Sequence, residues 1–341
     1  MKAVVLTKFG TSDKAFDIQE RPIPKAKAGE VCIKVEAFGL NFADVMARQG
    51  LYNDCPPLPT VLGYEVVGHI HEIGTGVEGL EVGQRVTGFT RFGGYAEYVT
   101  TVATGVALIP DDMDVGVAAA IPTQYGTAYF CAEEMVNMHE GDHVLIQAAA
   151  GGVGTALVQM AKNRGCIVYG TAGSDKKLEY LREQGVDHPI NYNTSDFEEY
   201  VKKHRGDAGI DVAFDSIGGQ SVKKARRLLT KGGGRIVCYG AASRSTKKIQ
   251  LFADIKLLLG FGLIKPIPML MNSQAFIGVN MLRVGDHRPN SLKRCLVNVV
   301  KQVNEGKLNP TVGGRFSVDE IAKAHDFLGG RKSIGKVVVT W

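Results

Sequence analysis

The distribution of apolar positions changes character near residue 121. Up to residue 120, short apolar runs such as 31–35 (VCIKV) alternate with turns rich in glycine and proline. This pattern is typical of short β-strands joined by tight turns and indicates a compact, partly closed barrel. From residue 121 to about residue 260, short apolar segments alternate instead with longer segments of helical periodicity. The chain therefore combines a β-rich part with an α/β part.

The α/β part predicts a doubly wound parallel sheet, because strands and helices alternate along it. The candidate strands are 143–148, 166–170, 212–215 and 235–240, and the helical patterns between and after them are 154–164, 176–184, 196–204 and 220–229. Helical patterns at 291–304 and 317–328 and a final strand at 335–340 follow. We expect the Rossmann-type domain, 123–262, to be inserted into a first domain made of 1–122 and 263–341.

Length, charge and cysteine content fit a two-domain enzyme. A chain of 341 residues exceeds what one core usually supports. The net charge of +5 is spread thinly, and no basic run with interleaved aromatics indicates nucleic-acid binding. The six cysteines form no CxxC motif, so neither a zinc ribbon nor a disulfide framework is indicated. The N-terminus lacks the apolar core of a signal peptide, and we expect a cytoplasmic protein.

One apolar stretch, 249–271, raises the question of membrane contact. It is interrupted by Asp254, Lys256, Lys265 and Pro266, whereas a spanning helix needs about 20 clean apolar residues. We expect a helix followed by a loop with an apolar tip. Its part 257–271 lines a substrate pocket, contacts a second subunit or docks peripherally on a membrane, and the sequence leaves these alternatives open.

A glycine-rich turn joins the first strand of the α/β part to its first helix. Segment 143–154 reads HVLIQAAAGGVG, with Ala148 where the usual dinucleotide fingerprint begins with glycine. The backbone at Gly151 and Gly152 can approach a pyrophosphate closely, and Gly154 lets the helix pack tightly on the strand. The start of the helix offers free N–H donors and partial positive charge. This strand–turn–helix context predicts dinucleotide binding.

The end of the next strand predicts which dinucleotide is bound. Segment 168–174 (VYGTAGS) carries no acidic residue, whereas an NAD enzyme needs one there for the ribose 2′-hydroxyl. Ser174 and Lys177 offer a hydroxyl and an ammonium to a 2′-phosphate, although Asp175 argues in the opposite direction. We therefore predict NADPH as the cofactor.

Several motifs together resemble the zinc-free quinone oxidoreductases, a family of the medium-chain dehydrogenase/reductase superfamily. They are the glycine loop, GLNFADVMARQGLY at 39–52, LGYE at 62–65, VGQRV at 82–86 and IGKV at 334–337. Segment 265–282 is more similar to the vesicle amine transport protein branch of that family. The resemblance implies a GroES-like β-barrel domain, an inserted Rossmann domain, NADPH between them and a homodimer.

The resemblance also implies roles for single residues. Asn41 would lie beside the nicotinamide and the substrate, and Tyr52 and Tyr64 would line the pocket with hydroxyls suited to a carbonyl oxygen. Two plainer interpretations stay open: Asn41 as the cap of the following helix, and both tyrosines as ordinary half-buried residues. The residues implied to contact the cofactor are Asn41, Thr127, Gly151, Gly152, Val153, Gly154, Gly173, Ser174, Lys177, Tyr192, Ser216, Gly240, Ala241, Ile277, Gly278 and Val279.

The same positions bear on the presence of a metal. Zinc-dependent relatives hold a cysteine near position 41 and a histidine directly before Glu65, and this chain has Asn41 and Tyr64 there. Asparagine and tyrosine cannot replace thiolate and imidazole as zinc ligands, so we expect no metal. Without a Lewis acid, the hydride must go to an acceptor that is already electrophilic. Met46 stands where bacterial relatives often carry a tyrosine. The proton donor or carbonyl partner that this tyrosine would supply is missing, which argues against assigning activity toward one specific quinone.

Two functions of different classes follow. The first is an NADPH-dependent reductase of quinones or α,β-unsaturated carbonyls that acts on a small molecule. The second is an NADPH-binding protein that associates with membranes or partners and has little catalytic activity. The second rests on the vesicle-branch resemblance, Met46 and the apolar segment 257–271.

Overall fold

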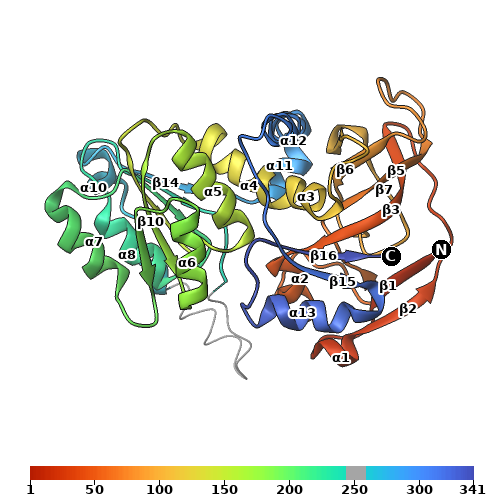
Figure 1. Ribbon diagram of the computed structural model, residues 1–341, viewed down its shortest axis with the longest axis horizontal. Helices are drawn as coiled ribbons and strands as arrows, with labels where there is room; N and C mark the ends of the chain where they lie inside the picture. The colour runs from red at the N-terminus through yellow and green to blue at the C-terminus, as the bar shows by residue number, and fades with distance from the viewer. Residues whose placement is uncertain (243–258) are drawn as a thin grey trace. The chain divides into compact units, whose positions relative to one another are not determined.

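The computed structural model describes residues 1–242 and 259–341, which form two compact units (Figure 1). The first unit comprises Met1–Thr127 and Leu282–Trp341, and the second comprises Ala128–Met281. The middle of the chain is thus inserted into a unit built from both ends. The chain leaves the first unit near residue 127 and returns at 282, where we expected 122 and 263.

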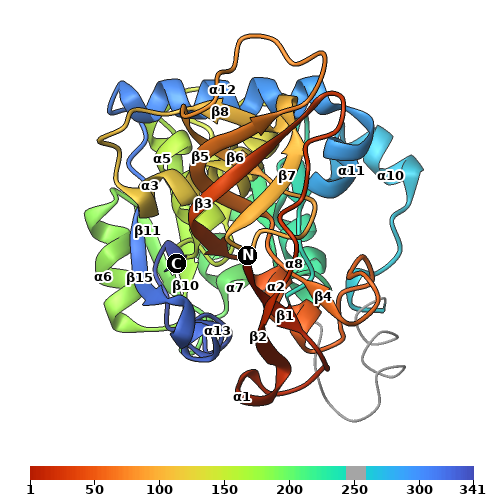
Figure 2. The ribbon, with the colours of Figure 1, turned by 90° about the vertical axis from the view of Figure 1, so that its right-hand side faces the viewer.

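A curved seven-stranded sheet forms the body of the first unit (Figure 2). Its central strand is β3 (Glu30–Leu40), which pairs antiparallel with three others. Two register shifts along β3, after Cys32 and after Val35, mark irregularities of the kind that bend a strand. The other strands are β5 (Glu65–Ile73), β6 (Arg85–Phe89), β7 (Tyr98–Val102), β8 (Val106–Leu108), β15 (Val312–Ser317) and β16 (Lys336–Thr340).

The remaining elements of the first unit close it around an apolar core. A three-stranded sheet of β2 (Phe16–Glu20), β1 (Lys2–Leu6) and β4 (Thr60–Val61) lies beside the larger one. Phe38 and Tyr95 stack within the core with ring centroids 4.4 Å apart. The helices are α1 (Ser12–Ala15), α2 (Phe42–Arg48), α3 (Val115–Ala120), α11 (Met281–His287), α12 (Pro289–Asn304) and α13 (Ile321–Gly329). Strand β16 of the tail pairs with β3, so the tail contributes to the large sheet of the first unit.

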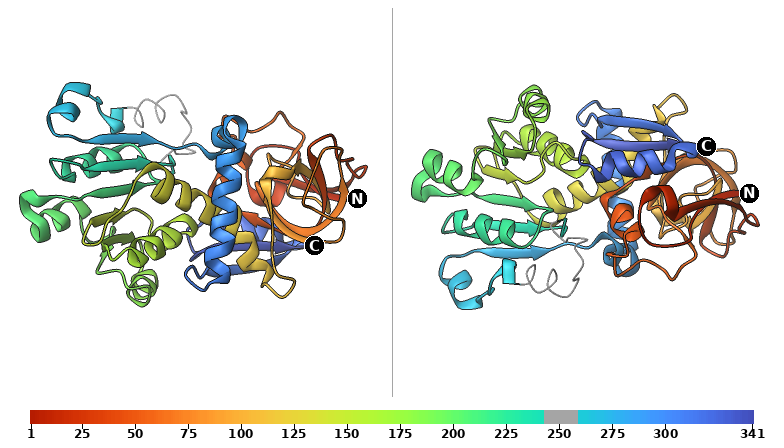
Figure 3. Two further views of the ribbon diagram at one scale, coloured as in Figure 1. Left: turned by 90° about the horizontal axis from the view of Figure 1, so that it is seen from above. Right: turned by 90° about the horizontal axis from the view of Figure 1, so that it is seen from below.

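The second unit is a six-stranded, all-parallel sheet with helices on both faces (Figure 3). The strand order is β11-β10-β9-β12-β13-β14, the doubly wound order of a Rossmann fold. The strands are β9 (His143–Ile146), β10 (Ile167–Ala172), β11 (His188–Asn191), β12 (Val212–Asp215), β13 (Arg235–Cys238) and β14 (Ala275–Gly278). The helices are α5 (Gly152–Asn163), α6 (Asp175–Glu183), α7 (Phe197–Arg205), α8 (Gln220–Leu228) and α10 (Pro266–Met271), and α4 (Gly126–Tyr129) joins the units. The predicted fold class is confirmed.

Two strands of this sheet differ from the sequence-based expectation. β11 contains a histidine and a proline, which hid it from a search for apolar runs. β14 pairs with β13, so the parallel sheet continues beyond the expected domain boundary at 262/263. Within the apolar stretch, 262–265 is a loop and 266–271 is a short helix. Residues 249–258 of that stretch lie outside the described residues.

Candidate functional site

The glycine loop lies at the carboxyl edge of the parallel sheet, between β9 and α5. Gly151 occupies the N-cap position of α5, so the N–H groups of the first turn have no partner within the helix. That turn contains no acidic residue. β9 and β12 are neighbours at the point where the strand order reverses, which is where open parallel sheets bind dinucleotides. The loop therefore lies where open parallel sheets bind dinucleotides. The N–H groups at the start of α5 supply the partial positive charge that a pyrophosphate would need.

The conformation of the loop explains its composition. Ala148 has a φ of +52°, a left-handed conformation that usually requires glycine. Its N–H donates to the Thr171 hydroxyl (3.1 Å), which in turn donates to Gln147 Oε1 (2.8 Å). A Cβ on Gly154 would overlap the carbonyl oxygen of Ala148 and lie 2.8 Å from the Cα atom of Ala149. The second and third glycines thus keep their roles although alanine replaces the first.

The end of β10 brings together the residues predicted to bind the 2′-phosphate. Ser174 is the N-cap of α6, and its hydroxyl accepts a hydrogen bond from the backbone N–H of Lys177 (3.4 Å). The Tyr192 side chain lies over Gly173 so closely that a Cβ there would overlap the phenol. Asn193, which the sequence did not single out, donates from Nδ2 to the Gly173 carbonyl (2.8 Å).

The remaining predicted cofactor residues also lie at the carboxyl ends of the strands. The Ser216 carbonyl accepts from the N–H of Ala242 (3.0 Å), and a Cβ on Gly240 would lie 2.7 Å from the same oxygen. Asp215 accepts hydrogen bonds from the backbone N–H groups of Ile217 (2.8 Å) and Gly218 (2.7 Å) and so fixes the turn after β12. This role of Asp215 was not predicted from the sequence. Ile277 and Gly278 belong to β14 and Val279 follows it, whereas Ala241 follows Gly240 directly. These residues fit a dinucleotide extended along this edge.

A separate polar cluster lies in the first unit, at the start of α2. Asn41 precedes α2 at its N-cap position and is 9% exposed. Its backbone N–H donates to Asp44 Oδ2 (2.8 Å), as in a capping box. Its side chain donates from Nδ2 to Glu65 Oε1 (2.8 Å) and accepts at Oδ1 from Lys336 Nζ (3.3 Å). Asn41 therefore takes part in the capping of α2 and also hydrogen-bonds Glu65 and Lys336 through its side chain.

An ion pair between Lys336 and Glu65 forms the centre of the cluster. Both side chains are fully buried, and Lys336 Nζ contacts Glu65 Oε1 directly. Glu65 Oε2 accepts from the backbone N–H of Thr123 (3.1 Å). Gly39 makes room for the pair, because a Cβ there would overlap the Glu65 carboxylate and the end of the Lys336 side chain. The pair was not predicted from the sequence, although each residue is a charge beside an apolar run.

The two tyrosines predicted to line the pocket lie together in this unit. Their rings meet edge-on, with centroids 6.2 Å apart, and Phe92 packs on Tyr64 at 5.0 Å. The Tyr64 hydroxyl is buried and adjoins the Tyr52 hydroxyl. Burial raises the pKa of both phenols, so both remain protonated at neutral pH. Thr127, the remaining predicted cofactor contact, is buried in α4.

Comparison with known proteins places the chain in a family. Residues 27–111 match the alcohol dehydrogenase GroES-like domain, and residues 152–282 match the family described as zinc-binding dehydrogenase. The synaptic vesicle membrane protein VAT-1 homolog of Rattus norvegicus is 35% identical, over 99% of this chain and 84% of that protein. The chain belongs to the quinone oxidoreductase family of the medium-chain dehydrogenases/reductases. Within it, the chain is close to the VAT-1 branch.

Further relatives define the activity and the cofactor. The 2-haloacrylate reductase of a Burkholderia species is 31% identical over 99% of this chain and 98% of that protein. A mycobacterial structure complexed with NADPH superimposes with a TM-score of 0.86 at 27% identity and covers both chains completely. This member of the quinone oxidoreductase family is accordingly an NADPH-dependent oxidoreductase that acts on a small molecule. Among residues 1–242 and 259–341, no group of three or more His, Cys, Asp or Glu side chains is arranged to hold a metal ion.

Asp44 makes a testable contribution to stability. Burial and the nearby Glu65 carboxylate raise its pKa to about 7, although the N–H of Asn41 opposes the shift. Because the folded pKa exceeds the unfolded value, this group favours the folded state most at low pH, and the contribution is lost as the pH rises to about 7. The free energy of unfolding of the protein relative to Asp44→Asn should therefore fall by about 1.4 kcal/mol per pH unit between pH 5 and 7. Chemical denaturation at several pH values measures it, and a pH-independent difference would contradict it.

Proposed function

We propose that this protein reduces quinones or α,β-unsaturated carbonyls by hydride transfer from NADPH, without zinc. The observation that carries the proposal is the polar cluster of the first unit. Where zinc-dependent relatives hold thiolate and imidazole, Asn41 is hydrogen-bonded to Glu65 and Lys336, and Tyr64 packs among aromatic rings. A quinone oxidoreductase-like protein of Bos taurus, 31% identical over 95% of this chain, and the 2-haloacrylate reductase support a conjugated acceptor.

The proposal divides the chemistry between the two units. NADPH, when bound, supplies the hydride, and the second unit holds its pyrophosphate at the start of α5 and its 2′-phosphate near Ser174 and Lys177. The first unit binds the acceptor. There the neutral Tyr64 hydroxyl, which adjoins the Tyr52 hydroxyl, can donate to a carbonyl oxygen. Tyr52 and Phe92 shield that oxygen from water, which strengthens hydrogen bonds to developing negative charge.

An acceptor panel tests the proposed function. NADPH oxidation should be rapid with benzoquinones, naphthoquinones, alkenals and 2-haloacrylates, and absent with saturated ketones of similar size, because only the conjugated acceptors carry their own electrophilicity. A zinc chelator should leave the rates unchanged. Absence of turnover across the panel, by protein shown to bind NADPH, would refute the proposed function.

The contribution of Lys177 to cofactor choice gives a separate prediction. Lys177→Ala should weaken NADPH binding about 10-fold or more and leave NADH binding unchanged, because a charge-assisted hydrogen bond to the 2′-phosphate contributes about 1.5–3 kcal/mol. The neighbouring, exposed Lys176 offers a matched control, and Lys176→Ala should bind both cofactors normally. Fluorescence titrations with each cofactor measure the effect. Equal losses in both variants, or for both cofactors, would contradict the assignment.

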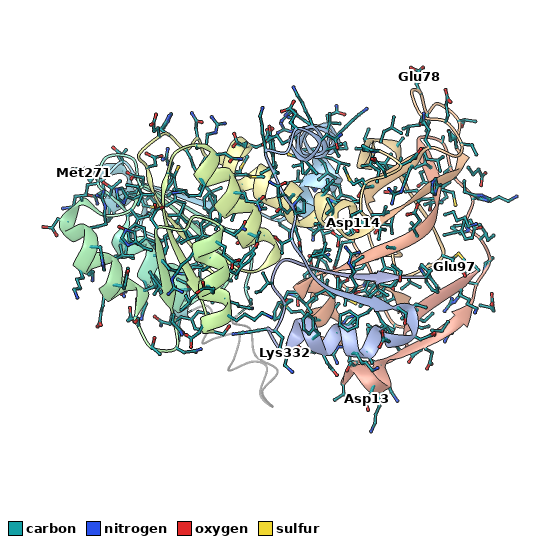
Figure 4. All side chains as sticks on the ribbon, viewed as in Figure 1. Asp13, Glu78, Glu97, Asp114, Met271 and Lys332 are labelled. Carbon is teal, nitrogen blue, oxygen red and sulfur yellow. The ribbon has the colours of Figure 1, made fainter. Side chains whose placement is uncertain are left out.

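The apolar surface of the second unit favours a second function, association with membranes. Leu263 is 81% exposed and Ile264 42% exposed, and α10 carries the exposed Ile267, Leu270 and Met271, the last marked at the periphery in Figure 4. No helix within residues 1–242 and 259–341 is long and apolar enough to cross a bilayer, so contact here would be peripheral. Residues 257 and 258 of the predicted apolar segment lie outside the described residues.

Liposome co-sedimentation distinguishes the possible roles of this surface. Docking predicts binding to anionic vesicles that is lost in Leu263→Asp/Ile264→Asp. The same surface adjoins β14, the edge strand of the sheet, which would suit the homodimer that we also propose. If the protein does not bind vesicles, and light scattering shows a dimer that becomes a monomer in the double variant, the surface is a subunit contact.

A further inference from the structure

The buried ion pair of Lys336 and Glu65 uses all three donors of the ammonium and both oxygens of the carboxylate. The Lys336 ammonium has three N–H donors, and the structure gives it three acceptors: Glu65 Oε1, Asn41 Oδ1 (3.3 Å) and the Leu40 carbonyl (3.4 Å). Both oxygens of Glu65 are also used, Oε1 by Lys336 and Asn41 and Oε2 by Thr123. The ammonium is therefore saturated and has no donor left for a ligand.

Asn41 is different, because its amide is only partly used. An asparagine side chain offers two N–H donors on Nδ2, and one of them goes to Glu65 Oε1 (2.8 Å). The second N–H has no acceptor among the residues that the structure describes. A buried amide hydrogen without a partner is unfavourable, so its retention points to a ligand that accepts there. Asn41 also lies in the same unit as Tyr64.

The ion pair fixes which way the Asn41 amide faces. With Oδ1 toward the ammonium and Nδ2 toward the carboxylate, both contacts are attractive. A flipped amide would place its NH₂ against Lys336 and its oxygen against Glu65, and both contacts would be repulsive. The ammonium also draws electron density toward Oδ1, which makes the free N–H a stronger donor. The two charges thus orient and polarise a neutral group between them.

We propose that Lys336, together with Glu65, is a positioning residue for the reduction: it holds Asn41 so that the unused amide N–H binds the acceptor's carbonyl or quinone oxygen. This inference rests on the proposed function and extends it. As negative charge develops on that oxygen during hydride transfer, the polarised N–H stabilises it, and the buried ammonium supplies the positive field. The specificity that follows is for acceptors with an oxygen conjugated to the carbon that receives the hydride.

The test uses a variant that removes both charges and preserves packing. Glu65→Gln/Lys336→Met has nearly the same volume, and removal of a whole buried pair is far better tolerated than removal of one partner. With a quinone and an alkenal, kcat should fall about 10- to 100-fold, since misplacement of a reacting group by about 1 Å costs up to 100-fold. The dissociation constant for NADPH should not change. Asn41→Ala should lower kcat by a similar factor, and adding it to the double variant should lower kcat less than 3-fold further, because the residues act as a unit.

A second readout reports orientation directly. The side-chain amide signals of Asn41 in NMR spectra of nitrogen-labelled protein, assigned by their loss in Asn41→Ala, should shift in the double variant. A folded double variant with kcat within 3-fold of the unaltered protein would overturn the proposal, as would unshifted Asn41 signals. If the unaltered protein binds NADPH and turns over no acceptor, the proposed function itself fails, which is a distinguishable result.

Discussion

Replacing Lys336 with methionine should lower the free energy of unfolding of the first unit by about 3–5 kcal/mol, the usual cost of a buried charge left without its partner. Glu65 is fully buried and, among the residues that the structure describes, would retain only hydrogen bonds from the Asn41 side chain and the Thr123 backbone. Neither donor carries a charge. The carboxylate must then stay ionised in an apolar surrounding or bind a proton, and either course costs free energy at neutral pH.

The chain contains its own reporter for this measurement. Trp341 is the only tryptophan and follows β16 directly, with its ring 6.2 Å from that of Phe38 in the core of the first unit. Its fluorescence during urea denaturation therefore follows the unit that contains the ion pair. The exposed Lys332, labelled in Figure 4, provides the matched control, and Lys332→Met should change stability by less than about 0.5 kcal/mol.

The double variant separates charge from packing. Glu65→Gln/Lys336→Met should recover most of the stability lost by Lys336→Met, because no unpaired charge remains. A single variant as stable as the Lys332→Met control would show that the pair is dispensable. A double variant as unstable as the single would show that the Lys336 side chain acts through packing alone.

The parts of the fold that the sequence predicted depend on local patterns. The strand–turn–helix at 143–154 appears in the structure as β9 and α5, since buried β-strands and glycine turns are specified by neighbouring residues. Strand β12 was predicted to the residue. In contrast, β11 begins His188-Pro189, where polarity and a missing N–H obscure a strand defined by its pairing with β10. Its existence depends on tertiary contacts that no local window contains.

The polar cluster of the first unit could not be predicted from local sequence patterns, for a related reason. Lys336 and Glu65 are 271 positions apart, and each looks in isolation like a charge at the edge of an apolar strand. Gly39 makes room for both side chains because it has none of its own, but this role becomes apparent only once the structure is known. The sequence identified Asn41 through its neighbours in a motif, but the groups that orient Asn41 come from distant segments. Local sequence therefore predicted the glycine-rich strand–turn–helix better than the polar cluster of the first unit.

Adding one methyl group at Gly154 should disrupt the second unit more than the same change three residues earlier. A Cβ on Gly154 would overlap the Ala148 carbonyl and crowd the backbone of Ala149, which cannot move without shifting β9 or α5. We expect Gly154→Ala to lower stability by about 1–3 kcal/mol, as forced overpacking does. NADPH binding should fall at least 100-fold, because the start of α5 moves away from the pyrophosphate.

Gly151 is the matched control within the same loop. It has an ordinary φ of −78°, and the nearest atom to an added Cβ is the Ala148 carbonyl oxygen at 3.1 Å. Gly151→Ala should therefore change thermal stability by less than about 1 kcal/mol, while NADPH titration shows weaker binding, since a side chain in this loop would hinder the close approach of a pyrophosphate. Normal NADPH affinity in Gly154→Ala would mean that close packing of α5 on β9 is not what holds the cofactor. Equal destabilisation by both substitutions would mean that the loop tolerates no side chain, whatever space lies around it.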